Sequence, residues 1–474
     1  MSSKKASVDV IFAQEPPPGP LGTFSVMAIA LGSQLGIGLI SFLPTAISTM
    51  GTRAWFIFPI IILLTVVYTL PLFFMSATVR TSAGASGFIC AVTKNPYVIG
   101  LIQATSFFLP VYMAIFALGF TSYLSILLPG INAVVAGVLM ITAFYAVNLL
   151  GTKWMARIQN IMLPILLTGL ALYIAFAFAN GDFSRLSPSS AEFSVGGSTG
   201  FITGSFLLFA MSFGYSCIAT LGRVAKDAKK NIPHGYLICV AIVLGLFFTM
   251  GAATAIAAPI AEIGGTLIGV VARIFPTWLF VVWMIAVPGL LIATSVNGFF
   301  GVVVEALDLS ARQGWLPISW TRTNKRGTKV ILLTVIYVIG CIPVVTGWSV
   351  SDMASYYQFI TFIAEIFGFY YIFKLPTSFK EAWEKSKFHV PDAILYIIIA
   401  LAIIIKCVTM FIAAQTMNPV FIVFTLGYIA AAFVWVVLRV RSGKAQIVVG
   451  CWGDGVNLAS PEASSGVNGI VTAD

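Results

Sequence analysis

Apolar segments long enough to cross a bilayer recur along almost the whole chain of 474 residues. A membrane-spanning helix needs roughly 20 mostly apolar residues. Only 9% of the residues are charged and 59% are hydrophobic, whereas soluble proteins carry about 25% charged residues. Because so few polar side chains cannot cover a water-exposed surface, the sequence predicts an all-α polytopic membrane protein.

The hydropathy pattern predicts twelve spans between a polar N-terminal tail (1–21) and a hydrophilic C-terminal tail (441–474). The first tail contains no apolar core followed by a small-residue cleavage site, so we expect no cleavable signal peptide. The second tail ends in a stretch rich in Gly, Ser and Ala and is predicted to be disordered. The spans are expected near 22–49, 54–78, 97–127, 131–150, 155–179, 199–222, 235–258, 277–304, 328–347, 353–373, 391–413 and 419–440.

The basic residues fall mainly on one side of this topology. Of the 26 Lys and Arg residues, only Arg53, Arg185 and Arg273 lie in the opposite loops, and Lys406 lies within span 11. Loops rich in Lys and Arg stay in the cytoplasm, so we expect a cell-membrane protein with both termini cytoplasmic. The net charge of +10 is spread over separate segments, which gives no reason to expect a nucleic-acid partner.

The first predicted span contains the stretch LGSQLGIGLISFLP, which includes Gly32, Gly36 and Gly38. Each Gly inside a helix costs roughly 0.5–1 kcal/mol relative to Ala. Within hydrocarbon, a broken helix is tolerated only where it lines a cavity or is buried in protein. Close helix packing is the alternative explanation, because Gly32 and Gly36 have small-xxx-small spacing. The polar residues Ser33 and Gln34 in the same stretch favour a break.

A second interruption occurs five spans later, in the stretch FAMSFGYSCIA. Ser212, Gly214, Tyr215 and Ser216 lie in the middle of this sixth span. Matching interruptions in two halves of a chain indicate a transporter site. Broken helix ends offer free N–H groups to an anion, and unwound carbonyl groups can accept hydrogen bonds from an ammonium. A small zwitterion such as an amino acid would use both.

The two interruptions divide the span region into two repeats. Spans 1–5 (about 22–180) and spans 6–10 (about 199–373) would form the halves, and spans 11 and 12 (about 391–440) would be appended. Because five is an odd number, the second half runs in the opposite direction. The sequence therefore predicts a 5+5 inverted repeat within a transporter domain that covers 22–440.

Further motifs follow in order along the chain: GASGF (84–88), NLLGTKWMARIQ (148–159), KDAKKNIP (226–233), SVNGFF (295–300) and ARQGWLP (311–317). Together with the two interrupted spans, they resemble the amino acid–polyamine–organocation superfamily of permeases. The resemblance implies a LeuT-like fold with discontinuous helices 1 and 6. It also implies secondary active transport of amino acids or related amines by alternating access, and we favour an exchanger. It implies no enzymatic activity.

The chain departs from the family pattern in its charged residues. The acid that usually follows the aromatic residue of span 6 is replaced by Ser216, and the acid usually found just after that span is replaced by Val224. The lysine that some members carry in span 5 aligns with Leu166, and the basic position late in span 8 is replaced by Glu305 and Asp308. An antiporter of polyamines or of amino acids and their decarboxylation products therefore remains an alternative.

The candidate site residues lie at the two interruptions or are expected near them. A sodium site needs several oxygen ligands, and Thr294 and Ser295 are the only two side-chain ligands that we can assign to one. This favours sodium-independent transport. They join Glu305 and Glu365 as candidates for coupling or gating. The substrate-binding candidates are Ser33, Gln34, Gly36, Ile37, Gly38, Tyr112, Phe213, Gly214, Tyr215, Ser216, Phe299 and Glu365.

Three ionisable residues are expected in or at the edge of spans, where a charge costs about 2.5–3.5 kcal/mol. Glu365 shares a polar stripe with Gln358 and Thr361, and we interpret it either as a pocket acid that binds a cation or carries a proton, or as a structural carboxylate. Glu305 is expected to pair with a cation of a cytoplasmic loop. We assign Lys406 no role in transport. Its side chain is expected either to snorkel toward the membrane surface or to make a contact in a homodimer.

Other chemistry finds little support in the sequence. The phosphate-binding motif GxxxxGK[ST] is absent, and so is any cofactor motif. His234 and His389 lack metal-ligand spacing, and the six cysteines are scattered. A channel and an intramembrane enzyme remain distant alternatives, since a channel needs a repeated filter and an enzyme needs paired catalytic groups.

Overall fold

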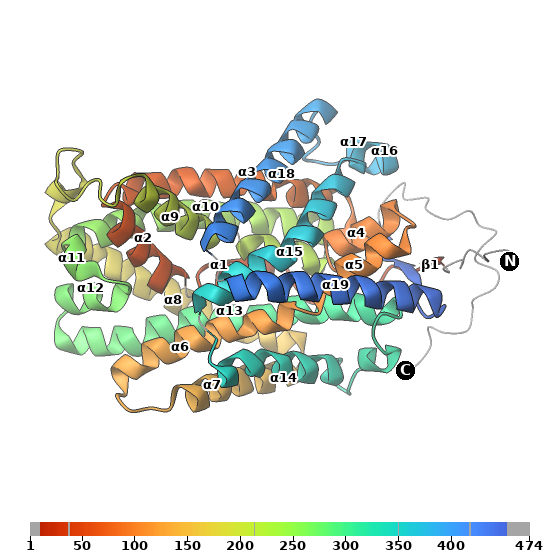
Figure 1. The fold of residues 1–474 in the computed structure, drawn as a ribbon, viewed down its shortest axis with the longest axis horizontal. Coiled ribbons are helices and arrows are strands. Elements are labelled where there is room, and N and C mark those ends of the chain that lie inside the picture. The colour runs from red at the N-terminus through yellow and green to blue at the C-terminus, as the bar shows by residue number, and fades with distance from the viewer. Residues whose placement is uncertain (1–9, 37, 213, 349, 417–418, 453–474) are drawn as a thin grey trace.

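A computed structural model describes residues 10–36, 38–212, 214–348, 350–416 and 419–452. Within these ranges the regular structure is almost entirely helical, and the long helices lie roughly along the long axis of the molecule (Figure 1). The elements up to residue 180 are β1 (Val10–Phe12), α1 (Thr23–Gln34), η1 (Gly38–Phe42), α2 (Leu43–Met50), α3 (Ala54–Thr78), β2 (Arg80–Thr81), α4 (Ala85–Val92), α5 (Pro96–Ser106), η2 (Leu109–Tyr112), α6 (Met113–Leu127), α7 (Ala133–Leu149) and α8 (Thr152–Asn180).

The second part of the chain repeats the pattern of long helices joined by short ones. Its elements are η3 (Phe183–Leu186), α9 (Gly197–Ala210), η4 (Gly214–Arg223), α10 (Ala228–Ala257), α11 (Ile260–Ile263), α12 (Leu267–Ile274), α13 (Thr277–Arg312), η5 (Ile318–Thr321), α14 (Val330–Thr346), α15 (Val350–Ile372), α16 (Leu375–Ser378), α17 (Lys380–Glu384), α18 (Asp392–Thr416), α19 (Pro419–Arg441), β3 (Ile447–Val449) and β4 (Cys451–Trp452).

Nine helical segments among the described residues are long and apolar enough to cross a membrane. The predicted polytopic helical architecture is therefore confirmed. The three other predicted spans coincide with the shorter apolar helices α7 and α14 and with α15. Span 3 was expected as one helix, but it consists of α5, the 3-10 turn η2 and α6, because Pro110 in η2 cannot donate a backbone hydrogen bond.

The first broken helix lies in the core of the bundle. In α1, Val26, Ala28, Ile29, Ala30 and Leu31 are fully buried, and the helix contacts α8, α10 and α13. A helix that is apolar on every side needs such an enclosed position. In contrast, α18 and α19 leave many large apolar side chains exposed, as expected for helices at the lipid boundary.

The two interrupted segments cross each other in opposite directions. The first half of one, α1, packs against the second half of the other, η4, while α2 packs against α9. Among the remaining spans, α3 packs against α10 and α7 against α14. In the two predicted repeats, α3 and α10 occupy equivalent places, and so do α7 and α14.

Both terminal regions add short strands at one end of the bundle. β1 pairs in parallel with β3, and β2 pairs in antiparallel with β4. The predicted disorder of the C-terminal tail is therefore wrong for 447–452. The apolar side chains of Ile447, Val449 and Cys451 are buried there, and strand pairing satisfies backbone groups that a disordered tail would leave to water. Residues 453–474 lie outside the described part of the chain.

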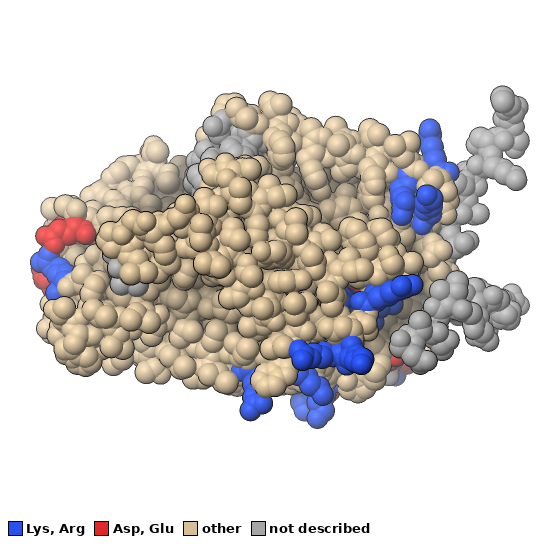
Figure 2. Space-filling model, turned by 90° about the horizontal axis from the view of Figure 1, so that it is seen from below, with Lys and Arg blue, Asp and Glu red and all other residues tan. Residues whose placement is uncertain are grey.

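Charged side chains are distributed unequally between the two ends of the molecule. On the face shown in Figure 2, Lys and Arg gather toward the end where β1 lies, here named the basic end. The opposite end shows a small group of both signs (Figure 2). The helices α11 and α12 lie at that end (Figure 1), and Glu262 and Arg273 form an ion pair between them. The charge asymmetry predicted from the sequence is therefore an asymmetry between the two ends of the bundle.

Candidate substrate site

Both interrupted segments break where the sequence predicts it. α1 ends at Gln34, and the next helical element is the π-helical turn η1. η1 begins at Gly38 and continues into α2. α9 ends at Ala210 and the chain resumes at Gly214 as the 3-10 helix η4. Two predicted site residues, Ile37 and Phe213, lie outside the described residues.

The Gln34 side chain joins the two breaks. Its amide nitrogen donates to the carbonyl oxygen of Met211, and its amide oxygen accepts a hydrogen bond of 3.2 Å from the backbone N–H of Tyr215. Gln34 is only 3% exposed. A backbone group that a helix break leaves unpaired is costly in a membrane interior, and Gln34 satisfies one such group on each side of the second break. Gln34 therefore holds the site together and has little capacity left for substrate.

The glycines permit several close approaches at the breaks. A Cβ on Gly36 would lie 2.7 Å from Ser295 Oγ, one on Gly38 would lie 2.6 Å from Met211 Cβ, and one on Gly214 would lie 2.5 Å from the carbonyl oxygen of Ser33. Atoms cannot approach so closely without displacement. The structure thus supports both explanations for the glycines, because they allow the break and also close packing around it.

Residues of two family motifs form a buried polar network behind the first break. Asn297 donates to Gln159 Oε1 at 2.9 Å and to the carbonyl oxygen of Met155 at 3.0 Å. Gln159 in turn donates to the carbonyl oxygen of Ala28 at 3.1 Å. This network connects α13, α8 and α1. Both motifs are visible in the sequence, but the structural role of these two amides is not.

The two candidate coupling hydroxyls are engaged with backbone carbonyl groups. Ser295 Oγ donates to Gly32 at 2.7 Å and lies 3.1 Å from the carbonyl oxygen of Leu291, while Thr294 Oγ1 donates to the same Leu291 oxygen at 3.0 Å. Both residues are fully buried. Ser295 thereby ties α13 to the last turns of α1, close to the first break.

Four aromatic side chains form a cluster beside the first break. The ring centroid of Tyr112 lies 4.1 Å from that of Tyr357 and 5.7 Å from that of Phe299, and Phe116 lies 5.7 Å from Phe299. Phe116 also lies 3.6 Å from the position of a Cβ on Gly36. The structure therefore brings Tyr112 and Phe299 together. Phe116 was not among the predicted site residues, although its position one helical turn after Tyr112 was a usable signal.

Tyr215 lies elsewhere. It is fully buried, its hydroxyl lies 3.3 Å from Thr65 Oγ1 and 3.4 Å from Thr69 Oγ1, and its ring contacts Tyr236. These partners belong to α3 and α10, so Tyr215 packs η4 against those helices. Ser216, the next residue, is half-buried.

Ser33 is a predicted site residue near the end of α1. The residue is half-buried, and its Oγ atom is buried. The atom lies beside Gly298, where a Cβ would lie 3.3 Å away, and close to Cys217 of η4. The hydroxyl is therefore enclosed where α1, α13 and η4 meet.

Glu365 belongs to a buried polar cluster with the residue that the sequence analysis set aside. Lys406 Nζ lies 2.6 Å from Glu365 Oε2 and donates to Gln358 Oε1 at 3.0 Å. The hydroxyl of Tyr68 also donates to Glu365. The snorkelling or dimer role expected for Lys406 is wrong, because α18 packs along α15 and α3 and directs this side chain into the bundle. Lys406 is 1% exposed.

A second ionic cluster lies where η4, α13 and the segment before α14 meet, and we name it the Asp308 cluster. Asp308 Oδ2 lies 2.5 Å from Arg223 Nη1, 2.9 Å from Arg312 Nε and 3.1 Å from Lys329 Nζ. Lys329 also lies 3.1 Å from Glu305 Oε1, so the predicted pairing of Glu305 with a loop cation is confirmed. The cluster ties η4 to α13 and to the segment just before α14.

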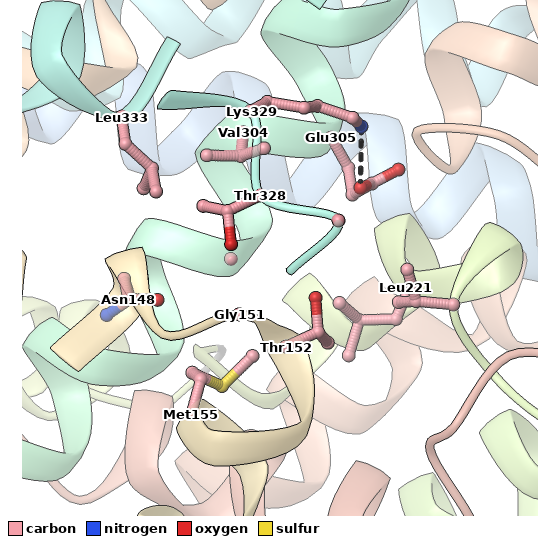
Figure 3. A pocket seen from close by; sticks show the side chains of 13 residues that line it. Asn148, Gly151, Thr152, Met155, Leu221, Val304, Glu305, Thr328, Lys329 and Leu333 are labelled. Carbon is pink, nitrogen blue, oxygen red and sulfur yellow. Dashed lines mark hydrogen bonds and ion pairs between the residues drawn. The ribbon is translucent and has the colours of Figure 1, made fainter. Parts of the chain in front are cut away.

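A small cavity of about 60 Å³ lies beside this cluster (Figure 3). Its wall includes Asn148, Thr152, Leu221, Glu305 and Lys329, which come from the ends of α7, α8, η4 and α13 and from the segment before α14. The Glu305–Lys329 ion pair lies at its edge (Figure 3). The wall of the cavity is therefore mixed, because Met155, Leu221 and Leu333 line it together with these polar and charged residues.

Apolar spans and two broken helices that pack against each other are the features expected of a polytopic membrane transporter. Residues 21–436 match the family described as amino acid permease, and the chain belongs to this family of transporters, which are not enzymes. An uncharacterized protein of Methanocaldococcus jannaschii is 23% identical over 239 residues, which are 48% of this chain and 53% of that protein. The chain thus matches about half the length of this relative.

Proposed function

We propose that this permease is a secondary active transporter that exchanges amino acids by alternating access. The observation that carries the proposal is the pair of crossing breaks connected by Gln34. Two short helices begin at the breaks, at Gly38 and Gly214, and helix N-termini favour a carboxylate. An ammonium group would bind carbonyl groups at the ends of α1 and α9 other than those of Gly32 and Met211, which already accept hydrogen bonds from Ser295 and Gln34.

The aromatic cluster supplies the remaining part of the site. Tyr112, Phe116, Phe299 and Tyr357 lie beside the first break, where they would receive the substrate side chain. A polyamine has no carboxylate, so it would leave the helix N-termini at the breaks without a partner. We therefore place amino acids ahead of polyamines and decarboxylation products as substrates.

The Asp308 cluster is the proposed gate on one side of the membrane. It connects the interrupted segment η4 to α13, and the cavity beside it is the proposed exit path. We place this basic end in the cytoplasm, because membrane proteins retain positively charged loops there. Both termini would then be cytoplasmic.

Counterflow in proteoliposomes tests the exchange mechanism. Vesicles loaded with an unlabelled amino acid mixture should accumulate a labelled amino acid faster than empty vesicles. Equal uptake in both would contradict exchange, whereas the absence of uptake for every amino acid would contradict amino acid transport.

A matched pair of glycine variants tests the position of the site. In Gly214→Ala the added Cβ would lie 2.5 Å from the Ser33 carbonyl oxygen, whereas at Gly245, in α10, an added Cβ meets no atom within 4 Å. We expect Gly214→Ala to lose exchange and Gly245→Ala to keep it, with both proteins folded. Full exchange by Gly214→Ala would show that the breaks are not the site.

A further inference from the structure

The buried ion pair between Glu365 and Lys406 connects the transporter core to one of its two appended helices. The ammonium group of Lys406 has three hydrogens to donate. They find acceptors in Glu365 Oε2 at 2.6 Å, Gln358 Oε1 at 3.0 Å and Thr361 Oγ1 at 3.5 Å. The three acceptors are the polar stripe of α15. Lys406 is therefore fully partnered in a position that lipid and water do not reach.

Glu365 differs from Lys406 in its surroundings. The Lys406 side chain is 2% exposed, whereas that of Glu365 is 27% exposed. Tyr68, which donates to Glu365, also packs its ring against Phe209 at 5.7 Å, and Phe209 is next to the last residue of α9. The carboxylate thus lies between Lys406 on one side and the second break on the other.

The same carboxylate is on α15, the helix that contributes Tyr357 to the aromatic cluster. The ring of Tyr357 lies 4.1 Å from the ring of Tyr112. Tyr357 is on α15, two turns before Glu365. Without Lys406, Glu365 would therefore lose its cationic partner on the helix that also carries Tyr357.

We propose that Lys406 is a specificity-determining residue, a cation built into the protein that neutralises Glu365 and thereby restricts the site to neutral amino acids with apolar or aromatic side chains. This inference rests on the proposed amino acid site between the breaks. Because Lys406 occupies the place that a cationic substrate group would take, lysine-like amino acids and diamines find no negative partner. Their charge would be desolvated without compensation, which is costly.

Displacement of Lys406 by a substrate cation is also unfavourable. The displaced ammonium would remain among buried groups of α15 and α18, and an unpaired charge in such surroundings is strongly destabilising. Selectivity would therefore come from the rejection of the wrong ligand as well as from contact with the right one. In this arrangement an appended helix, which contributes nothing to the two repeats, determines which side chains enter.

The test compares Lys406→Met with the double variant Lys406→Met/Glu365→Gln. Phenylalanine, leucine, lysine and putrescine are titrated against each purified protein, with thermal stability as the readout. The parent should respond to phenylalanine and leucine only. Lys406→Met should gain at least about tenfold in affinity for lysine or putrescine, which corresponds to one favourable ion pair of about 1.4 kcal/mol. The double variant should lose that gain.

The controls separate this inference from the proposed function. Lys380→Met removes an exposed lysine paired with Glu384 and should leave the ligand preference unchanged. A parent protein that binds lysine or putrescine as well as phenylalanine would overturn the inference, even if Lys406→Met fails to fold. A cationic preference that persists in the double variant would also overturn it. A parent that binds no amino acid would instead contradict the proposed function.

Discussion

Replacement of Asp308 by Asn should open the basic end of the transporter. In the structure, one carboxylate oxygen of Asp308 accepts contacts from three cations, Arg223, Arg312 and Lys329, at 2.5–3.1 Å. Asp308 is 1% exposed. The substitution leaves the shape of the side chain almost unchanged, but it removes the only charge that holds these cations together at that oxygen.

The size of the effect follows from burial and screening. Removal of one partner from a buried ion pair costs about 3–5 kcal/mol. The side chains of Arg223 and Arg312 are 28% and 35% exposed, so water can compensate part of their charge, and Lys329 keeps Glu305. We therefore expect a value near the lower limit, about 3 kcal/mol, which shifts the equilibrium between closed and open forms about 100-fold.

Thiol labelling measures this opening. Thr152 lines the cavity next to the cluster, so a Thr152→Cys variant reports access when its labelling rate is corrected for the native cysteines. Labelling should be much faster in the presence of Asp308→Asn. The matched control is Asp182→Asn, an exposed aspartate paired with Arg185 in a loop. Equal labelling of Asp308→Asn and the control would refute the idea that this cluster keeps the end closed.

Three other perturbations give further tests. Gln34→Leu leaves the Met211 carbonyl oxygen and the Tyr215 N–H without this partner, so unfolding in denaturing detergent should show a loss of about 1–3 kcal/mol, and an unchanged stability would contradict the bridging role. Replacement of sodium by choline should leave uptake unchanged, because sodium needs several oxygen ligands and we assign only two hydroxyls; a collapse of uptake would show sodium coupling. Trp452→Ala removes a hydrogen bond of 2.8 Å to the carbonyl oxygen of Ala13, so thermal unfolding should show a loss of about 1–2 kcal/mol, and an unchanged melting temperature would show that the terminal strands add no stability.

The position of the breaks was predictable because the signal is local. Glycines and polar residues within a long apolar stretch are costly unless the backbone changes direction there, and both interruptions are at the predicted places. The polar stripe of Gln358, Thr361 and Glu365 was also predictable, since helical spacing alone puts these residues on one face. The loop partner of Glu305 followed from its place near the end of a span.

The roles of individual side chains were less predictable. Gln34 and Tyr215 are next to the breaks in sequence, yet one bridges them and the other packs against α3 and α10. Sequence proximity does not fix the direction in which a side chain points, because that direction depends on how the irregular backbone turns. Phe116 and Tyr357 belong to separate helices, α6 and α15. Helix packing decides the rotation of each helix about its own axis and so brings both side chains into the aromatic cluster.

The sequence by itself determined that the chain is a bundle of membrane helices, where two of those helices break, and which end carries the positive charge. These properties depend on hydropathy, glycine and charge counts within short windows. Only the tertiary structure decided that Lys406, about 40 residues from Glu365 and on an appended helix, would neutralise it. The physical reason is that an ion pair depends on two helix faces meeting, and no local pattern specifies which helices become neighbours.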